Sequence, residues 1–273
     1  MTKKLVIVND CAHVMENLLP VVSSVYDVKY LKRTRSPLSK TLGLAWRILA
    51  TNGDIYHVNY GLQDAYLVEK LKGHLDVLHL HGSDVRTALK TAWLGWMVKS
   101  NIMNAERVLY ATEDMKNDVM RLRPDAIYLP TPVNVDLFGY KELYAVKPKA
   151  VYFKLSYEAL PSALPSLLKK AGLSLDIFDK VIPYRDMPAL LRKYDIYIDR
   201  FSIPSLSKTA LEAMSVGLAT IDYRNRDALE ERIEFLSDPG NVRSEGVLNR
   251  NFIIKQHDHR LVGERLLDIY RGL

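Results

Sequence analysis

The stretch 54–84, DIYHVNYGLQDAYLVEKLKGHLDVLHLHGSD, decides the fold of this chain. Residues 54–59 and residues 75–81 are short runs of mostly apolar side chains, as buried strands are. Residues 62–71 lie between them and have the length and apolar spacing of an amphipathic helix. A strand, a helix and a second strand in this order predict a parallel βαβ unit.

The same alternation continues on both sides of this stretch. Further strands are expected at residues 5–9, 27–31, 107–111, 126–129, 150–155, 175–178, 181–184, 195–200 and 219–222. Pro130, Pro132 and Pro148 bracket a segment that cannot be regular helix, which indicates a domain boundary near residues 138–149. We therefore predict an α/β protein with two Rossmann-like domains whose parallel sheets face a central cleft. The expected parts are residues 1–143, residues 144–257 and a terminal helix at 258–273.

Composition excludes several classes of protein. The chain has 273 residues, 48% hydrophobic and 26% charged, so it is not globally disordered. One cysteine, Cys11, excludes an internal disulfide and a multi-cysteine zinc site, and we expect it to be a core residue. The net charge of +6 is spread over both halves, so no nucleic-acid partner is expected. Because no apolar run is long enough for a leader or a membrane span, we expect a cytoplasmic protein.

Ligands of open parallel sheets bind at the carboxyl ends of the strands, so the loops there are the first candidates for a site. His81 begins the loop His-Gly-Ser-Asp after one expected strand, where a glycine allows close approach and an imidazole can exchange hydrogen bonds. An equally good interpretation is an ordinary turn with a satisfied histidine and Asp84 capping the next helix. His57 and His79, within strands, are expected to be packing residues.

The second candidate loop lies in DIYIDRFSIPSLSKTALEAMSVGLATI, residues 195–221. Ser207, Lys208 and Thr209 open a helix, and backbone N–H groups, hydroxyls and an ammonium together suit a diphosphate. Glu212 follows near the helix start and could accept hydrogen bonds from sugar hydroxyls. The alternative is an ordinary capped helix with a solvent-facing glutamate.

Taken in order, these segments resemble the retaining glycosyltransferases of family 4, which have the GT-B fold. The similarity extends through AERVLYATEDMKNDVMRLRPDAIYLPTPVNVDLF (105–138), VIPYRDMPALLRKYDIYID (181–199) and LEAM (211–214). It implies transfer of a sugar from a nucleotide-diphosphate sugar of the UDP or GDP type, without a further cofactor or a bound metal. The implied catalytic residues are His81 and Asp199. The implied donor-binding residues are Lys154, Tyr184, Arg200, Ser207, Lys208, Thr209 and Glu212.

The chain also departs from the family pattern. Pro204 stands where a first motif glutamate is expected, and Ala159 stands at a second cation of the phosphate clamp. Asn9-Asp10-Cys11-Ala12-His13 replaces a glycine-rich loop. These departures keep open a non-catalytic protein of the same fold that binds a nucleotide sugar or a partner. A nucleotide-sugar epimerase is a further alternative, disfavoured because no additional carboxylate cluster is evident.

The resemblance places the acceptor, a glycan, a lipid-linked molecule or a protein, on the first domain. Residues 29–40 are basic and contain no acidic residue. We expect Lys32, Arg33, Arg35 and Lys40 on this acceptor or membrane side. A following helix with Leu38, Leu42, Trp46 and Leu49 on one face could touch the inner face of a membrane. The favoured alternative is a helix packed on the sheet, and Trp93, Trp96 and Met97 are likewise expected in the core.

Overall fold

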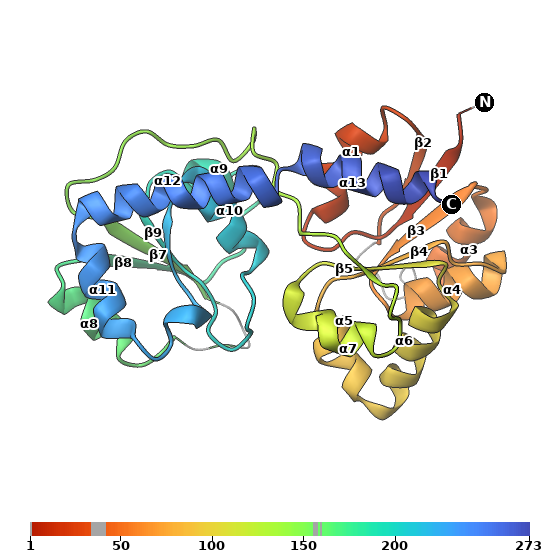
Figure 1. Ribbon diagram of the computed structural model, residues 1–273, viewed down its shortest axis with the longest axis horizontal. Coiled ribbons are helices and arrows are strands. Elements are labelled where there is room, and N and C mark those ends of the chain that lie inside the picture. The colour runs from red at the N-terminus through yellow and green to blue at the C-terminus, as the bar shows by residue number, and fades with distance from the viewer. Residues whose placement is uncertain (1, 34–41, 155–157, 159) are drawn as a thin grey trace. The chain divides into compact units, whose positions relative to one another are not determined.

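The computed structural model describes residues 2–33, 42–154, 158 and 160–273 of the chain. Contacts divide it into two compact units (Figure 1). Unit 1 comprises Met1–Pro132 and His259–Leu273, and unit 2 comprises Val133–Asp258. Both are α/β units with parallel sheets, as the alternation of apolar runs and amphipathic segments predicts.

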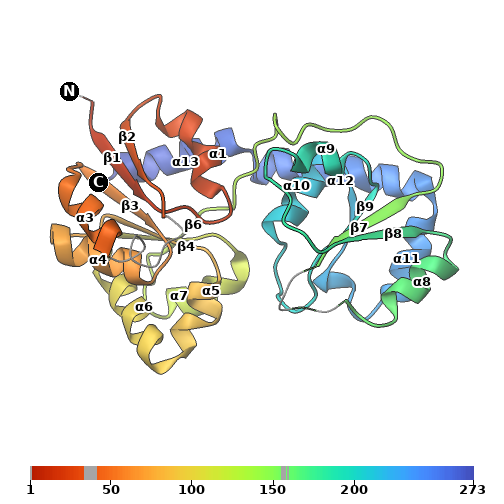
Figure 2. The same cartoon turned by 180° about the vertical axis from the view of Figure 1, so that it is seen from behind.

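The sheet of unit 1 is parallel, with strand order β2-β1-β3-β4-β5-β6. Its strands are β1 (Lys4–Val8), β2 (Asp27–Leu31), β3 (Ile55–Asn59), β4 (Val77–Leu80), β5 (Arg107–Tyr110) and β6 (Ile127–Tyr128). Each face is covered by helices with its own apolar core (Figure 2). One face carries α1 (Val14–Val22) and α13 (His259–Arg271). The other carries α3 (Leu42–Ala50), α4 (Gln63–Lys72), α6 (Ala92–Asn104) and α7 (Lys116–Met120), while the short α5 (Ser83–Arg86) follows β4.

The C-terminal helix α13 completes unit 1. Gly263 lies against Val21 of α1, so that an added Cβ would come within 2.7 Å of that side chain. The ring of Tyr270 packs edge-on against Tyr26 at 5.5 Å, and its hydroxyl lies 2.6 Å from Nδ1 of His57 in β3. The expected terminal helix is therefore present, and it fills the core beneath β1 and β3.

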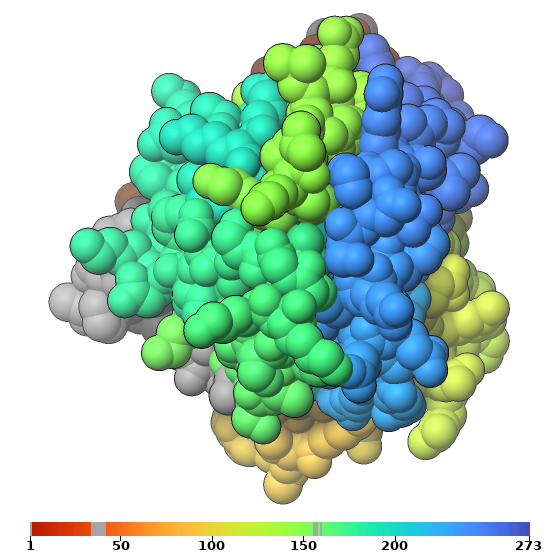
Figure 3. Space-filling view, turned by 90° about the vertical axis from the view of Figure 1, so that its left-hand side faces the viewer, coloured from red at the N-terminus to blue at the C-terminus, as the bar shows by residue number. Residues whose placement is uncertain are grey.

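Unit 2 repeats the design with strand order β10-β9-β7-β8. Its strands are β7 (Lys149–Phe153), β8 (Ser174–Phe178), β9 (Ile196–Ile198) and β10 (Ala219–Ile221). α9 (Met187–Leu191), α10 (Lys208–Val216) and part of α12 (Pro239–Gln256) cover one face, and α8 (Leu164–Lys170) and α11 (Leu229–Ser237) cover the other. In the surface view the blue α11–α12 segment lies beside the green segment that contains α8 (Figure 3).

The contacts divide the chain after Pro132, eleven residues before the boundary expected at residue 143. The reason is that the segment after Pro132 is built into unit 2. Val133 and Phe138 lie in its core. Lys141 donates its backbone N–H to Val216 at 2.9 Å, and its buried Nζ lies 2.6 Å from Asp195 Oδ1.

Two expectations about local structure are wrong, and two helices were missed. Residues 181–184 form no strand, because Val181 is exposed and Pro183 has no N–H to donate to a ladder. The helices α11 and α12 were not predicted. Trp93 and Trp96 of α6 do not lie in the core, since their side chains are 71% and 54% exposed.

Candidate functional site

In unit 2 the strand order changes direction at β7, because β8 lies on one side of it and β9 on the other. Open parallel sheets bind ligands at such a switch point, beside the carboxyl ends of the strands. The two strands pair in register, with Tyr152 opposite Ile198. Lys154 lies two positions after Tyr152, and Arg200 lies two positions after Ile198. They therefore leave the carboxyl edge of the sheet at neighbouring places, and Lys154 is exposed there. Two of the cations predicted from the sequence are thus brought to the same edge.

The β9–α10 loop holds the start of α10 beside this edge. Ser207 Oγ accepts a hydrogen bond from the backbone N–H of Ala210 at 3.0 Å, so Ser207 is the helix N-cap. Asp199 Oδ2 in turn accepts the backbone N–H of Ser207 at 2.8 Å. Burial raises the pKa of Asp199, and hydrogen bonds from Ser207 oppose the rise. Asp199 is therefore a positioning residue in this geometry, because its carboxylate holds the cap.

Two predicted residues pair with each other on α10. Lys208 Nζ lies 3.3 Å from Glu212 Oε1, one helical turn away, and the two side chains are only 11% and 4% exposed. Glu212 is thus not solvent-facing, in contrast to the alternative interpretation of this segment as an ordinary capped helix. It lies in the interior and balances the charge of Lys208, while Thr209 is half-buried in the same first turn.

Arg200 and Tyr184 complete the predicted set in unit 2. Arg200 contacts Ser205 Oγ at 3.3 Å from one terminal nitrogen, and its buried Nε has no hydrogen-bond partner among the described residues. Tyr184 packs against Phe138 with ring centroids 5.6 Å apart. Ala159, which the resemblance aligned with a second cation, lies outside the described residues.

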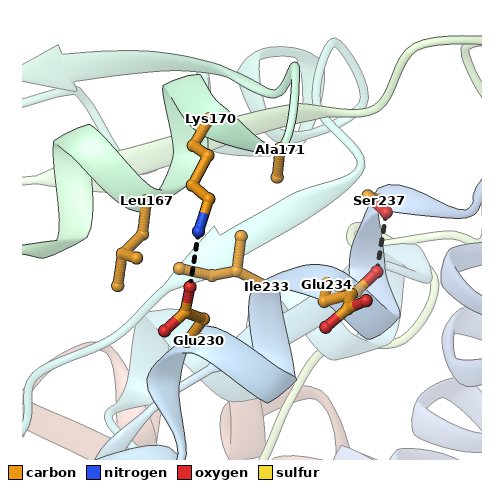
Figure 4. A pocket seen from close by; sticks show the side chains of 7 residues that line it. All are labelled: Leu167, Lys170, Ala171, Glu230, Ile233, Glu234 and Ser237. Atoms are coloured by element: carbon orange, nitrogen blue, oxygen red, sulfur yellow. Dashed lines mark hydrogen bonds and ion pairs between the residues drawn. The ribbon is translucent and has the colours of Figure 1, made fainter.

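A pocket of about 240 Å³ also lies between α8 and α11 (Figure 4). An exposed ion pair at 2.8 Å between Lys170 and Glu230 spans it, and Leu167 and Ile233 form its apolar wall. None of the residues predicted from the sequence lines this pocket. It is therefore separate from the β7–β9 edge.

In unit 1 the corresponding edge gathers polar groups around His81. Its Nε2 lies 2.9 Å from Asn59 Oδ1, at the end of the neighbouring strand. The buried carboxylate of Asp84 accepts backbone N–H groups from the two adjacent turns, namely those of Gly61, His81, Gly82 and Val85. Burial raises the pKa of Asp84, and these four hydrogen bonds oppose the rise. Asp84 thus fixes the loop that presents His81.

Three imidazoles form a column from the core to this loop. The ring centroids of His57 and His79 lie 5.5 Å apart, and those of His79 and His81 lie 4.2 Å apart with the ring planes tilted by 38°. His57 and His79 are fully buried, as expected for strand residues. Burial lowers the pKa of His57 to about 3 and lowers the pKa values of His79 and His81 as well. His81 is therefore presented as a neutral imidazole at ordinary pH.

The loop after β1 adopts left-handed backbone without a glycine. Asn9, Ala12 and His13 have φ of 64°, 51° and 59°. Such conformations are costly for residues with a side chain and cluster at functional positions. Asp10 secures the loop by accepting the N–H groups of Met15 at 2.9 Å and Glu16 at 3.1 Å, in the first turn of α1.

The same loop lines a pocket of about 230 Å³ that also contains Lys32 and Arg33. Arg33 pairs with Asp64 at 2.7 Å, and Lys32 lies over the ring of Tyr30. These two predicted acceptor-side residues are therefore brought together. Leu38 and the other two basic residues, Arg35 and Lys40, lie outside the described residues.

Sequence reasoning missed Asn59 and the role of Asp10, and it treated Cys11 as part of the core. Asn59 ends a predicted strand beside the His81 loop, which was the available signal. Burial and nearby Asp84 and Asp10 raise the pKa of the Cys11 thiol to about 12. A thiol with so high a pKa is a poor nucleophile. Cys11 is nevertheless only half-buried and belongs to none of the apolar cores, so the expected core position is not found.

No helix among the described residues is both long and apolar enough to cross a bilayer. No group of three or more His, Cys, Asp or Glu side chains among them is arranged to hold a metal ion.

No protein-family model and no curated protein sequence matches the chain. Solved structures do match. The HepE protein of Anabaena in complex with UDP-glucose has a TM-score of 0.71 at 9% identity, covering 99% of this chain and 100% of that one. The N-terminal domain of the Candida albicans trehalose-6-phosphate phosphatase has a TM-score of 0.65 at 7% identity, covering 98% of each chain.

A third match is a TarM variant of S. aureus whose crystals contain UDP and alpha-GlcNAc-glycerol. Its TM-score is 0.56 at 9% identity, and the match covers 93% of this chain but 58% of TarM. Identities this low establish the fold alone. The chain has a GT-B type of fold, with two Rossmann-like α/β units.

Proposed function

We propose that the chain is a glycosyltransferase that moves a sugar from a nucleotide-diphosphate sugar to an acceptor, with retention of the anomeric configuration. The observation that carries the proposal is the β7–β9 edge of unit 2. There Lys154 and Arg200 leave the sheet in register, beside a helix start capped by Ser207. HepE holds UDP-glucose and TarM holds UDP, which makes a UDP-sugar the first donor to test and a GDP-sugar the second.

The proposed chemistry needs the leaving diphosphate to be stabilised while the glycosidic bond breaks. Cations and N–H groups that are already in place do this without reorganising. Lys154, Arg200 and Lys208, with the first turn of α10, take this role. The proposal includes no protein-bound metal and no cofactor besides the donor. The bond from the anomeric carbon to the phosphate oxygen breaks, and a bond to the acceptor oxygen forms on the same face. The acceptor proton goes to the departing phosphate.

Unit 1 supplies the other half of the proposal. The neutral His81, held by Asn59 and Asp84, orients the donor sugar by a hydrogen bond without adding a charge. The resemblance predicts that the carboxyl edges of both units face a common cleft, and that arrangement belongs to the proposal. The acceptor is a glycan, a lipid-linked molecule or a protein bound to unit 1, at the cytoplasmic face of a membrane.

A specific observation also favours a second candidate, a protein that binds a nucleotide sugar without transferring it. Asp199 is engaged by Ser207, Glu212 is paired with Lys208, and Pro204 stands where the family has a glutamate. The carboxyl groups of this loop thus serve its own structure. Release of nucleoside diphosphate separates the two candidates, because a silent binder releases none.

The test has two steps. Thermal-shift screening with UDP-, GDP- and ADP-sugars should identify a stabilising donor, because a ligand that binds the folded state raises its stability. Release of nucleoside diphosphate from that donor should then fall at least about tenfold in Lys154→Ala, since a hydrogen bond to a charged group contributes about 1.5–3 kcal/mol. Lys169→Ala, an exposed lysine on α8, is the matched control and should leave release unchanged. Unchanged release in both Lys154→Ala and His81→Ala would refute the assigned site.

A further inference from the structure

The tryptophans of the chain share one environment. The sequence has three, Trp46, Trp93 and Trp96, and in the structure they are 70%, 71% and 54% exposed. All lie on α3 and α6, which cover the same face of the sheet of unit 1 (Figure 2). We call their outer side the tryptophan face, made of Leu42, Trp46 and Leu49 of α3 and Trp93, Trp96 and Met103 of α6.

Helix α3 is apolar on both sides. Leu44 and Ile48 are buried against the sheet, as a core-facing stripe requires. Leu42, Trp46 and Leu49, which follow one another by four and three positions, form a second stripe that faces outward. An ordinary surface helix has polar residues there, so this outer stripe is built for a non-aqueous contact.

Helix α6, which packs on the other side of α4, carries stacked exposed aromatics of its own. The rings of Trp93 and Trp96 are stacked with centroids 6.1 Å apart, and Tyr66 of α4 lies 6.3 Å from Trp96. Indole rings combine an apolar body with a polar N–H, and they prefer the headgroup level of a bilayer for that reason.

The charge around the tryptophan face is positive. The described residues 28–33 and 42–53 contain four Lys or Arg and no Asp or Glu, and residues 85–105 contain three and none. Among the described residues, the carboxylates of the intervening α4 are engaged, Asp64 with Arg33 at 2.7 Å and Glu69 with Lys70 at 3.0 Å. Lys90 lies 3.6 Å from Asp118 of α7, and Lys99 is exposed on α6 itself. Cations beside exposed aromatics complement anionic lipid headgroups.

We infer that unit 1 docks through the tryptophan face onto the surface of an anionic lipid bilayer. The indole rings of α3 and α6 enter the headgroup region, and the neighbouring lysines and arginines meet the lipid phosphates. The inference deepens one part of the proposed function, the location of unit 1 at a membrane, but it involves neither the donor nor the β7–β9 edge. The two can therefore fail separately.

The full chain offers a direct optical test. Because every tryptophan belongs to the tryptophan face, intrinsic tryptophan emission reports on this surface alone. Vesicles of phosphatidylcholine with phosphatidylglycerol should shift the emission to the blue and carry the protein into the pellet, whereas phosphatidylcholine alone should do so weakly. Binding should fall as salt is raised, because the lipid charge is screened. No emission shift and no pelleting at low salt would overturn the inference.

Variants separate this surface from other exposed apolar groups. Trp93→Ala/Trp96→Ala should lower the vesicle partition coefficient at least about tenfold, because each substitution removes a large apolar area that the bilayer would otherwise cover. Lys99→Glu should lower it less and reduce its salt dependence. Phe235→Ala, an exposed aromatic on α11 of unit 2, is the matched control and should bind as the wild type does. Equal loss in the control would contradict the inference. So would a self-associated wild type that Trp46→Ala makes monomeric in sedimentation, because the face would then bind a second copy.

Discussion

Helices α1 and α10 both begin at the carboxyl edge of their sheet, and the chain caps them in opposite ways. At α1 the carboxylate of Asp10 accepts two N–H groups of the first turn. At α10 the neutral hydroxyl of Ser207 accepts one, and Lys208 and Arg200 stand in or beside the loop. A helix start attracts negative charge. Unit 1 places the carboxylate of Asp10 on N–H groups of the first turn itself, whereas in unit 2 the carboxylate of Asp199 accepts the N–H of the capping residue Ser207.

The same contrast extends to the way the edges are held. In unit 1 the loops depend on buried carboxylates and on a column of neutral histidines. In unit 2 the buried Asp199 supports the cap, and the half-buried Glu158 accepts the backbone N–H of Ser202 at 3.0 Å in the same loop. The first edge is a fixed platform, and the second is poised for an anion. This difference leads us to place the donor diphosphate on unit 2, and it can be probed in each unit separately.

The largest expected effect is a loss of stability of unit 1 in acid. His57 and His79 are fully buried with lowered pKa values, His57 to about 3, while in the unfolded chain they titrate near their ordinary value. The unfolded state therefore binds protons first, and the stability of unit 1 should fall as the pH drops from about 6.5 toward 3. The loss should be roughly 1 kcal/mol per pH unit for each histidine.

Urea unfolding followed by tryptophan emission measures this dependence, because all tryptophans lie in unit 1. His79→Phe keeps an aromatic ring at this position. It should reduce the slope of the unfolding free energy against pH by about the contribution of one histidine. His74→Phe, at an exposed histidine, is the control and should leave it unchanged. A slope that His79→Phe does not alter would show that the column is not the cause.

The next effect compares the two buried aspartates. Asp84→Ala leaves four backbone N–H groups without their acceptor and should lower the free energy of unfolding by about 3 kcal/mol. Asp199→Ala removes the acceptor of the Ser207 N–H and should cost about 1–2 kcal/mol. Urea titration by circular dichroism measures both, with the exposed Asp125→Ala as control. Equal costs at the two positions would remove the distinction between a fixed and a poised edge.

The fold could be predicted where strands are buried on both faces. Residues 54–84 show this, because a parallel sheet needs uninterrupted apolar runs such as those of β3 and β4. Helices α11 and α12 were missed for the opposite reason. Ile233, Leu236, Val242 and Ile253 are their buried apolar side chains, too widely spaced to give a clear helical period.

The candidate site could be predicted by residue type but not by role. The two loops were found because glycine, histidine, serine and lysine at strand ends are unusual in a core. That Asp199 would hold Ser207, and Glu212 would pair with Lys208, depends on side-chain directions that spacing does not reveal. Trp93 and Trp96 were misplaced because an apolar residue is compatible with either a core or a contact surface.

The central claim is that the start of α10 binds the diphosphate, and exchanging its cap tests it most directly. Ser207→Asp places a carboxylate on the first turn of α10, as Asp10 does on the first turn of α1. Aspartate is also a good N-cap residue, so the helix start is preserved. Calorimetric titration with UDP, or with GDP if that stabilises the protein better, should show affinity at least about tenfold lower than the wild type. Asp10→Asn in unit 1 should bind as the wild type does. Wild-type affinity in Ser207→Asp would contradict the account.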